Sequence, residues 1–293
     1  MIHHLRSGRD DQAEAALAVI AAAEADVILL LDVDWDLDGV GLAALAARLE
    51  EMGQSYPYRI ALRPNSGTPS GFDLDGNGTD HEARDALGYG WFTGDSGLAL
   101  LSRLPIGDVR DLSATLWADR PDAANLMPEG AHAVVPLATT AQWVVPIRMG
   151  ETEITLVTMA AGTPVFDGPE DRNGLRNREE LAFVAELVAD AAAPLVLGRA
   201  NLDPERGEGH LEAIRALLEH PKLRDPRPER PGGGLETVAW NGPGHMRVDY
   251  VLPPRIAQVA GSGVIWPEDG SALAQAVAEA GSGRLVWVDL SVP

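Results

Sequence analysis

The chain has 293 residues, 45% of them apolar, which is enough for one large α/β domain or two small ones. It carries 44 acidic and 23 basic residues, a formal charge of −21, and such a field repels nucleic acid because affinity for phosphate comes largely from lysine and arginine. It contains no cysteine, which excludes disulfides and zinc–thiolate sites, and no apolar run approaches the length of a membrane span.

Helical and strand patterns follow one another along most of the chain. In chain order the predicted elements are helix 10–25, strand 27–31, helix 40–52, strands 58–62, 97–102, 142–148 and 153–159, helix 176–192, strand 195–197, helix 208–218, and strands 237–240, 248–252 and 284–289. The run at 27–31 is continuously apolar, so we expect a buried strand there. Gly150 and Glu151 mark the turn of a predicted hairpin.

Three segments show neither the helical nor the strand periodicity of apolar residues. Residues 63–91, rich in Gly, Asp, Asn and Ser, are predicted to form a long loop of the kind that often carries function, and residues 108–140 are irregular. Residues 225–234 read as a loop inside a domain, so the whole chain, 1–293, is predicted to be a single domain. Because helices alternate with strands only in part, the pattern favours a layered α/β sandwich over a doubly wound parallel sheet.

The most informative stretch is Gly198-Arg199-Ala200-Asn201, which directly follows the apolar run 193–197. It resembles the Gly-Asp-Phe-Asn turn of the endonuclease/exonuclease/phosphatase family, with an arginine where the aspartate belongs. Further segments resemble a bacterial branch of that family in their order and spacing: 25–34, 63–71 with 97–106, 164–174, 247–253 and 284–290. The resemblance implies a four-layered sandwich of two mixed β-sheets flanked by helices.

The resemblance also implies hydrolysis of phosphate esters with a divalent metal, usually Mg²⁺. That chemistry needs carboxylates to hold the metal, an Asp–His pair to deprotonate water, and Asn and His donors for the charge that develops on phosphorus. The corresponding positions in this sequence are Asp32, Ala160, Arg199, Asn201, Asp249 and Gly283.

Asp32 stands where the family places a metal-binding glutamate. Its carboxylate is retracted by about 1.5 Å, the length of one C–C bond, and a bridging water would let it still serve a hard cation. It is equally interpreted as a strand-end aspartate that faces solvent among Asp34, Asp36 and Asp38.

Two family histidines are missing. Ala160 replaces the phosphate-contacting histidine, and Gly283 falls where the resemblance expects the catalytic histidine. Asp249 matches the aspartate that supports this histidine, so it is left with nothing to support, and it is alternatively a structural aspartate bonded to backbone. His132 is too remote in sequence to be assumed as a substitute.

Arg199 changes the charge at the central position from −1 to +1. A divalent ion about 4 Å from a guanidinium feels roughly 8 kcal/mol of repulsion at an effective dielectric constant near 20. The planar fork of Arg199 is suited to bind an anion directly, such as phosphate or carboxylate. Asn201 keeps the family residue.

The amino-terminal end also departs from the family, which begins with a strand that ends in a metal-site asparagine. The sequence starts almost at the first predicted helix, so we expect that strand to be missing and a protein partner, or a second copy of the chain, to cover the gap. No signal peptide is visible, which makes the cytoplasm the default compartment, although relatives of this branch are often exported.

An acidic loop offers a second kind of site. Asp73, Asp75, Asn77 and Asp80 have the alternate spacing of a calcium loop, with Gly78 in the tight turn. Arg84 stands where the twelfth-position glutamate is usual, and Glu82 or Asp85 would have to substitute for it. The loop is otherwise an acidic surface loop of turn residues. A similar spacing at 34–39 is interpreted as a decoy because Leu45 occupies its twelfth position.

These observations predict a catalytically inactive family member retained for binding or assembly. Two alternatives stay open: an active Mg²⁺-dependent phosphoesterase with a rearranged site of Asp32, Asn201 and Asp249, and a calcium-stabilised scaffold that binds an anion through Arg199. The substrate or ligand, the identity of a partner and the oligomeric state do not follow from the sequence.

Overall fold

The largest sheet is mixed and has five strands, in the order β10-β7-β6-β5-β4. The structure is a computed structural model and describes residues 10–121, 123 and 126–292. The strands are β4 (Arg110–Asp111), β5 (Trp143–Met149), β6 (Thr152–Ala160), β7 (Pro194–Arg199) and β10 (Asp249–Leu252). β6 and β7 are parallel and are joined through helix α4 (Arg172–Asp190), whereas the other neighbours are antiparallel.

Two smaller groups of strands pack on one face of this sheet. Strands β1 (Val27–Val33), β3 (Gly97–Ser102) and β2 (Tyr58–Ile60) form an antiparallel sheet in the order β1-β3-β2, and β11 (Gln258–Ile265) pairs with β12 (Leu285–Ser291). The β3 side chains Leu98 and Leu100 pack with Trp143 and Val145 of β5. Val286 and Val288 of β12 pack instead around Leu195 of β7.

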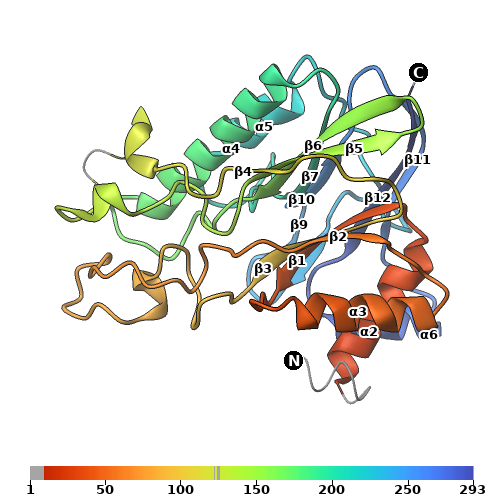
Figure 1. Cartoon of the computed structure of the whole chain (residues 1–293), viewed down its shortest axis with the longest axis horizontal. Coiled ribbons are helices and arrows are strands. Elements are labelled where there is room, and N and C mark those ends of the chain that lie inside the picture. The colour runs from red at the N-terminus through yellow and green to blue at the C-terminus, as the bar shows by residue number, and fades with distance from the viewer. Residues whose placement is uncertain (1–9, 122, 124–125, 293) are drawn as a thin grey trace.

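Helices cover the two outer faces. α4 and α5 (Leu211–Leu218) lie on the large sheet through a core that includes Leu181, Val184 and Ile214. α2 (Asp11–Ala23) and α3 (Val40–Glu51) pack on the β1 sheet, and α6 (Ala272–Ala280) contacts α2. Figure 1 shows α4 and α5 on one side of the strands and the other three helices on the opposite side. The predicted four-layered α/β sandwich is thereby confirmed.

Long loops form one end of the molecule, in the yellow and orange part of Figure 1. They have a core of their own that includes Trp117, Ala131 and Leu137. The short elements among the loops are η1 (Ala83–Asp85), η2 (Trp117–Asp119) and η4 (Ala131–Ala133). The hairpin of β8 (Val238–Trp240) and β9 (Gly244–Met246) lies elsewhere and packs on Val248, next to the start of β10. Arg176 of α4 ties the loops together, donating to the carbonyl oxygens of Leu87, Pro136 and Leu137. Burial lowers the pKa of Arg176 to about 10.

The structure corrects several predicted elements. α4 begins at residue 172 rather than 176, and α5 begins at 211 rather than 208, because Gly209 adopts a positive φ of 97° that interrupts a helix. β9, β11 and α6 were not predicted. β11 was not recognised because the Gly-rich stretch 261–263 interrupts the run of side chains that indicates a strand.

β1 was expected to be a buried strand, and this prediction was wrong. Of its five leading apolar residues only Ile28 is buried, while Val27, Leu29, Leu30 and Leu31 are partly exposed. Within the described residues β1 pairs with β3 alone and β12 with β11 alone, so each strand keeps one edge without a partner. A groove of about 800 Å³ lies between these two edges.

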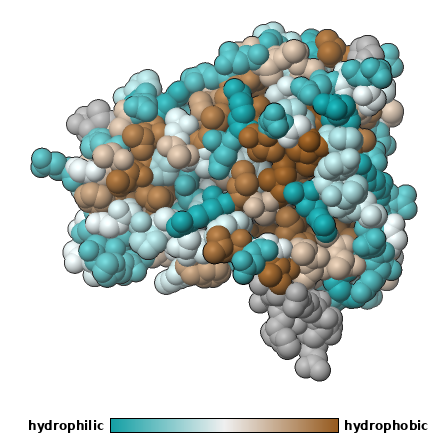
Figure 2. Space-filling model, in the orientation of Figure 1, coloured by the Kyte–Doolittle hydropathy of each residue, from teal (hydrophilic) through white to brown (hydrophobic). Residues whose placement is uncertain are grey.

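The groove accounts for the exposure of β1. Its floor is formed by side chains of the large sheet, such as Leu195 and Leu197, and α2 covers it with residues such as Ala16 and Ile20. Apolar residues also gather toward the middle of the face shown in Figure 2, with hydrophilic residues around the rim. Residues 1–9, the stretch ahead of the first helix where the first strand of the family was predicted to be missing, lie outside the described part of the chain.

Candidate functional site

The Gly198–Asn201 turn ends β7 at the mouth of the groove. Gly198 has a φ of 133°, and a Cβ atom there would lie 1.9 Å from the carbonyl oxygen of Met159 on the neighbouring strand. Only glycine allows β7 to approach β6 this closely. The turn thereby holds Arg199 opposite Ala160 in the β6 ladder and opposite Asp249 in the β10 ladder.

Arg199 bridges two carboxylates. Its Nε donates to Oδ1 of Asp249 at 2.8 Å, and its Nη1 donates to Oδ2 of Asp32 at 3.1 Å. The side chains of Arg199 and Asp249 are 21% and 11% exposed, whereas Asp32 is 66% exposed at the rim. The three residues therefore form one continuous ion-pair chain from the interior of the sandwich to its surface.

Asp32 reaches Arg199 because β1 is irregular at its end. The β1–β3 register shifts between Leu30 and Val33, and Asp32 has a positive φ of 59°, which is uncommon for a residue with a side chain. Asp32 thus leaves the ladder at the point where β1 passes the turn after β7. Asn201 also has a positive φ, of 54°, and its Nδ2 donates to the carbonyl oxygen of Ala161 at 2.8 Å.

Asp249 is held by a residue that sequence reasoning missed. The hydroxyl of Thr237 donates to Oδ2 of Asp249 at 3.1 Å and accepts from the backbone amides of Val248 and Asp249, each at 3.0 Å. Burial raises the pKa of Asp249, and the Arg199 guanidinium opposes this shift. Burial also lowers the pKa of Arg199, but Asp249 and then Asp32 outweigh it, so the pKa of Arg199 is raised. No sequence motif links positions 237 and 249.

The two positions without an imidazole lie on either side of Arg199. Ala160 pairs with Arg199 across the ladder, and a Cβ atom at Gly283 would lie 3.4 Å from Nη2 of Arg199. In the described part of the chain, no histidine bonds to Asp32, Arg199 or Asp249. The guanidinium thus lies beside the place where the resemblance expects a catalytic histidine.

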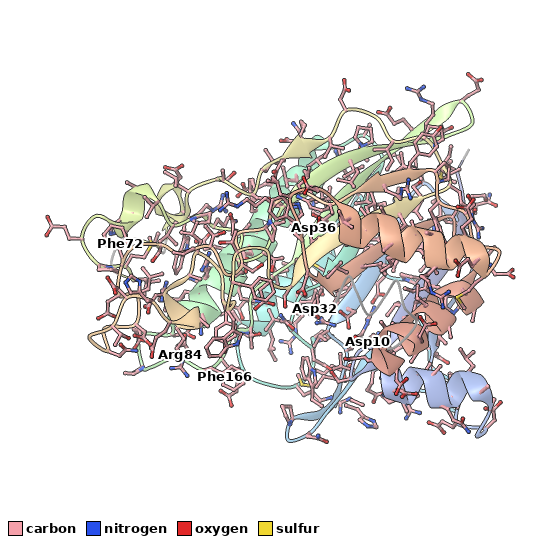
Figure 3. The ribbon with its side chains drawn as sticks, turned by 60° about the horizontal axis from the view of Figure 1, so that its bottom comes forward. Asp10, Asp32, Asp36, Phe72, Arg84 and Phe166 are labelled. Carbon is pink, nitrogen blue, oxygen red and sulfur yellow. The ribbon has the colours of Figure 1, made fainter. Side chains whose placement is uncertain are left out.

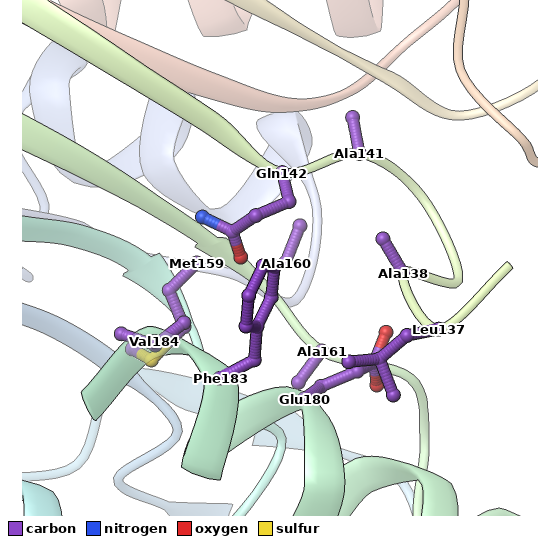
Figure 4. A pocket seen from close by; sticks show the side chains of 10 residues that line it. All are labelled: Leu137, Ala138, Ala141, Gln142, Met159, Ala160, Ala161, Glu180, Phe183 and Val184. Atoms are coloured by element: carbon purple, nitrogen blue, oxygen red, sulfur yellow. The ribbon is translucent and has the colours of Figure 1, made fainter. Parts of the chain in front are cut away.

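A small cavity lies beside Ala160, and its volume of about 10 Å³ is the size of about one water molecule. Figure 4 shows Gln142 and Glu180 among the residues that line it. Glu180 is fully engaged, because it accepts from the amides of Thr139 at 2.6 Å and Gly162 at 2.7 Å and from the Thr139 hydroxyl. Glu180 therefore fastens the loops beside Ala160, and the cavity itself is too small for a phosphate group.

The residues at Arg199 do not fit a divalent cation. Asp32 and Asp249 are the acidic ligands that such an ion would need, and each has an oxygen already bonded to the guanidinium. A cation between them would have to break two charge-assisted hydrogen bonds and stand beside a positive charge. The same groups form a chain of ion pairs in which Arg199 offsets one of the two negative charges, and this arrangement suits a structural role.

The acidic loop lies elsewhere. Figure 3 places Phe72 and Arg84, which flank the loop, toward the end of the molecule away from Asp32. Carboxylate oxygens of Asp73, Asp75 and Asp85 lie within 4.8 Å of one another.

The other two residues predicted from the calcium-loop spacing have different contacts. Asn77 accepts from Thr79 through its Oδ1 and donates to Asp75 and Glu82. The carboxylate of Asp80 lies 3.2 Å from His81. The structure thus joins Asp85, rather than Asp80, to the group of Asp73 and Asp75. Asp73 also accepts from the amides of Gly76 and Gly78.

Asp36, in the acidic stretch 34–39, stabilises the start of a helix. Its two carboxylate oxygens accept from the amides of Val40 and Gly41, each at 2.8 Å, at the start of α3. These bonds, that from Gly41 first, lower the pKa of Asp36, and partial burial opposes them. Asp36 therefore caps a helix.

Comparison with known proteins gives a consistent picture. The model of the Endonuclease/Exonuclease/phosphatase family matches residues 4–282. No curated protein gives a match. The helices in the described part of the chain all lack the combination of length and apolar character that a membrane crossing requires.

Several solved structures share the fold. An endonuclease/exonuclease/phosphatase from Beutenbergia cavernae is 17% identical with a TM-score of 0.62, and the match covers 97% of this chain and 66% of that longer one. A family protein from Leptotrichia buccalis is 14% identical with a TM-score of 0.56, covering 95% and 92% of the two chains. One from Bacteroides vulgatus is 10% identical with a TM-score of 0.55, covering 97% and 91%. At these identities the likeness concerns the fold alone.

Proposed function

We propose that this chain, which belongs to the endonuclease/exonuclease/phosphatase family, is a catalytically inactive member retained for binding or assembly. The family fold is typically metal-dependent, and the proposal rests on one observation. The Arg199 guanidinium bonds to both Asp32 and Asp249, the two acidic residues available at this site.

Electrostatics support the loss of the metal. A divalent ion about 4 Å from the guanidinium meets roughly 8 kcal/mol of repulsion at an effective dielectric constant of 20. This exceeds the free energy of binding of a ligand with millimolar affinity, about 4 kcal/mol. The ion would also have to compete for carboxylates that already carry charge-assisted hydrogen bonds.

The absence of a base supports the same proposal. Water attack on a phosphodiester needs a group that takes the proton, and such groups contribute roughly 10²–10⁴-fold to the rate. Ala160 and Gly283 offer no proton acceptor, and Asp249 is committed to Arg199 and Thr237. Asn201, an amide, is the one uncharged family residue kept, and it cannot act as the base.

The test is an assay of a generic phosphodiester, bis(p-nitrophenyl) phosphate, with Mg²⁺ or Mn²⁺. We expect no hydrolysis above the metal-only background. Turnover by the parent chain that is abolished in Asp32→Ala would overturn the proposal in favour of an active phosphoesterase with a rearranged site of Asp32, Asn201 and Asp249.

A metal titration tests the proposal separately from activity, because it measures metal binding in the parent chain and in a variant that should gain it. We expect the parent chain to bind no Mn²⁺ at Asp32 and Asp249, and Arg199→Met to gain weak binding, because it frees both carboxylates and removes the positive charge. Arg110→Met is the matched control, since Arg110 is an exposed arginine of the same sheet. Mn²⁺ binding by the parent that Asp249→Asn abolishes would contradict the argument.

The acidic loop supports a second, structural role. The clustering of Asp73, Asp75 and Asp85 suits a hard cation with oxygen ligands, and we assign it to Ca²⁺. Ca²⁺ should then raise the unfolding midpoint relative to a chelator, with about 2.7 kcal/mol of added stability at 100 times the dissociation constant. Asp75→Asn should remove most of this effect and Asp80→Asn little of it. An equal midpoint with Ca²⁺ and with chelator would refute the assignment.

The charge of the molecule supports a protein partner rather than nucleic acid. At −21 the chain lacks the excess of basic residues that phosphate neutralisation requires. Arg199 would be an anion site only if Asp32 and Asp249 released it. Binding of inorganic phosphate that Arg199→Met abolishes would support that alternative, and we expect none.

A further inference from the structure

We propose that the groove between β1 and β12 binds an extended polypeptide segment of a different protein, about seven residues long, which adds a strand between the two edges. This inference deepens the proposed function, since it names the kind of partner that a binding role would serve. Its experiment uses no metal and no phosphodiester, so the two proposals can fail separately.

The two facing edges carry the argument. β1 and β12 have seven residues each, and within the described chain each is paired on one side only. An unpaired edge offers a row of amide and carbonyl groups that a further strand can satisfy. Two such edges on either side of one groove would bond the same inserted strand on both of its sides, which joins β11-β12 and β1-β3-β2 into one sheet.

The direction of the strands fixes the pairing. β1 runs toward Asp32 and Arg199, whereas β12 begins just after Gly283, beside Arg199, and runs away from them. The two strands are therefore antiparallel to each other. An inserted strand would be parallel to one of them and antiparallel to the other, and about seven residues at roughly 3.3 Å each would fill a length of about 23 Å.

The walls of the groove select an apolar segment on both faces. On one face an inserted strand would meet apolar side chains of the large sheet, including Ile154, Leu195 and Val251. On the other it would meet Ala16 and Ile20 of α2. A strand covered on both faces is a continuous apolar run rather than an alternating one. The partly exposed Leu29 and Leu31 beside it gain the burial that they lack in this structure.

The charge of the groove favours basic residues at both ends of the bound segment. Six acidic residues and two arginines line the groove. Asp32 and Asp10, both labelled in Figure 3, are two of the acidic ones, and Glu24, Asp26 and Asp289 lie toward the other end of β1 and β12. One of the arginines, Arg199, is already neutralised by its two carboxylates. A segment with a basic residue on each side of its apolar run therefore complements the groove.

The probe is a labelled nonapeptide of seven Val, Ile and Thr residues with a lysine at each end, titrated with the full chain and followed by fluorescence anisotropy. We expect saturable binding, together with slower amide exchange in β1 and β12. Replacing both lysines by glutamate should weaken binding at least tenfold. N-methylation of either alternate set of peptide amides should weaken it at least tenfold as well, because each set would face one of the two edges.

A pair of chain variants tests the location. Ala16→Phe places a ring in the groove and should abolish binding, whereas Ala22→Phe, on an exposed position of the same helix outside the groove, should leave it unchanged. Folding of both variants is checked by circular dichroism.

Four outcomes would overturn the proposal: no binding of the probe, binding that survives N-methylation of one set of amides, equal binding by Ala16→Phe and Ala22→Phe, or slow exchange of both edges before any peptide is added. In the last case a concentration-dependent mass would identify a second copy as the occupant, and a constant monomer mass would identify a segment of the same chain.

Discussion

Arg199 shows how one side chain changes the balance of charge at a buried site. The side chain of Asp249 is 11% exposed, and among the described residues Arg199 and Thr237 are the side chains that bond to its carboxylate. Removing one partner of a buried pair leaves the other charge uncompensated, which commonly costs about 3–5 kcal/mol. Arg199 is therefore expected to contribute to folding although the ion pair offers no catalysis.

We predict that Arg199→Met lowers the free energy of unfolding by about 3 kcal/mol near neutral pH. The pKa of Asp249, already raised by burial, should rise further, so the folded variant binds a proton that the unfolded chain releases. Its stability should then fall with rising pH from about pH 4 upward, by about 1.4 kcal/mol per unit, until the folded-state pKa is passed. Denaturant titrations at several pH values measure this. A deficit as small as that of Arg110→Met would contradict it.

At the scale of residues, the sequence pointed to Asp32, Arg199 and Asp249 but not to the hydrogen bonds that join them. The spacing of Asp32, Arg199 and Asp249 along the chain carries no information about the irregular end of β1 that turns Asp32 toward the guanidinium. Thr237 was missed for the same reason, because its role depends on which two strands meet in space. The charge at residue 199 was readable from the sequence, whereas its neutralisation by two carboxylates depends on the fold.

At the scale of elements, strands with uninterrupted apolar patterns were predicted well. β3 has the predicted bounds, and the hairpin of β5 and β6 turns at Gly150 and Glu151 as expected. β11 was missed because Gly261 and Gly263 interrupt its pattern. The exposure of β1 could not be predicted, since a continuous apolar run indicates a buried strand only when both of its neighbours are present.

Because β6 and β7 lie so close together, we predict that alanine substitutions at Gly198 and Gly150 reduce the stability of the fold by very different amounts. Gly198→Ala should destabilise the fold by more than about 3 kcal/mol, because its Cβ would overlap the Met159 carbonyl group. Gly150→Ala should cost only about 1 kcal/mol, since Gly150 also has a positive φ but its Cβ would meet no atom within 4 Å. Thermal unfolding of both variants makes the comparison. Equal losses would show that the backbone angle, and not the contact, governs residue 198.

The cap of α3 predicts a pH effect of the opposite sign. Asp36→Ala should cost about 1 kcal/mol at neutral pH. The folded pKa of Asp36 is lowered, so its contribution is present above the ordinary value of 3.8 and is lost as pH falls through the folded value. The difference between parent and variant should therefore shrink below about pH 4. Asp38→Ala, at an exposed position of the same loop, serves as the control and should change little.

At the scale of the whole molecule, an excess of 21 negative charges acts against compactness. Added NaCl should screen this repulsion more than it weakens the buried Arg199 pairs. We predict that raising NaCl to about 0.5 M increases the unfolding temperature by about 2–4 °C, the shift that 1 kcal/mol gives in a domain of 150–250 residues. A decrease would mean that exposed ion pairs outweigh the net repulsion.

The position of Arg199 next to residue 283 limits what a single substitution could do at this site. The Cβ atom of a histidine at residue 283 would lie 3.4 Å from Nη2 of Arg199, so its ring would stand beside a positive charge. An aspartate at residue 199 would have no imidazole at residue 283 to support, because that residue is glycine. We therefore expect neither Gly283→His nor Arg199→Asp alone to introduce phosphodiester hydrolysis, because each would still lack the partner that the other substitution supplies.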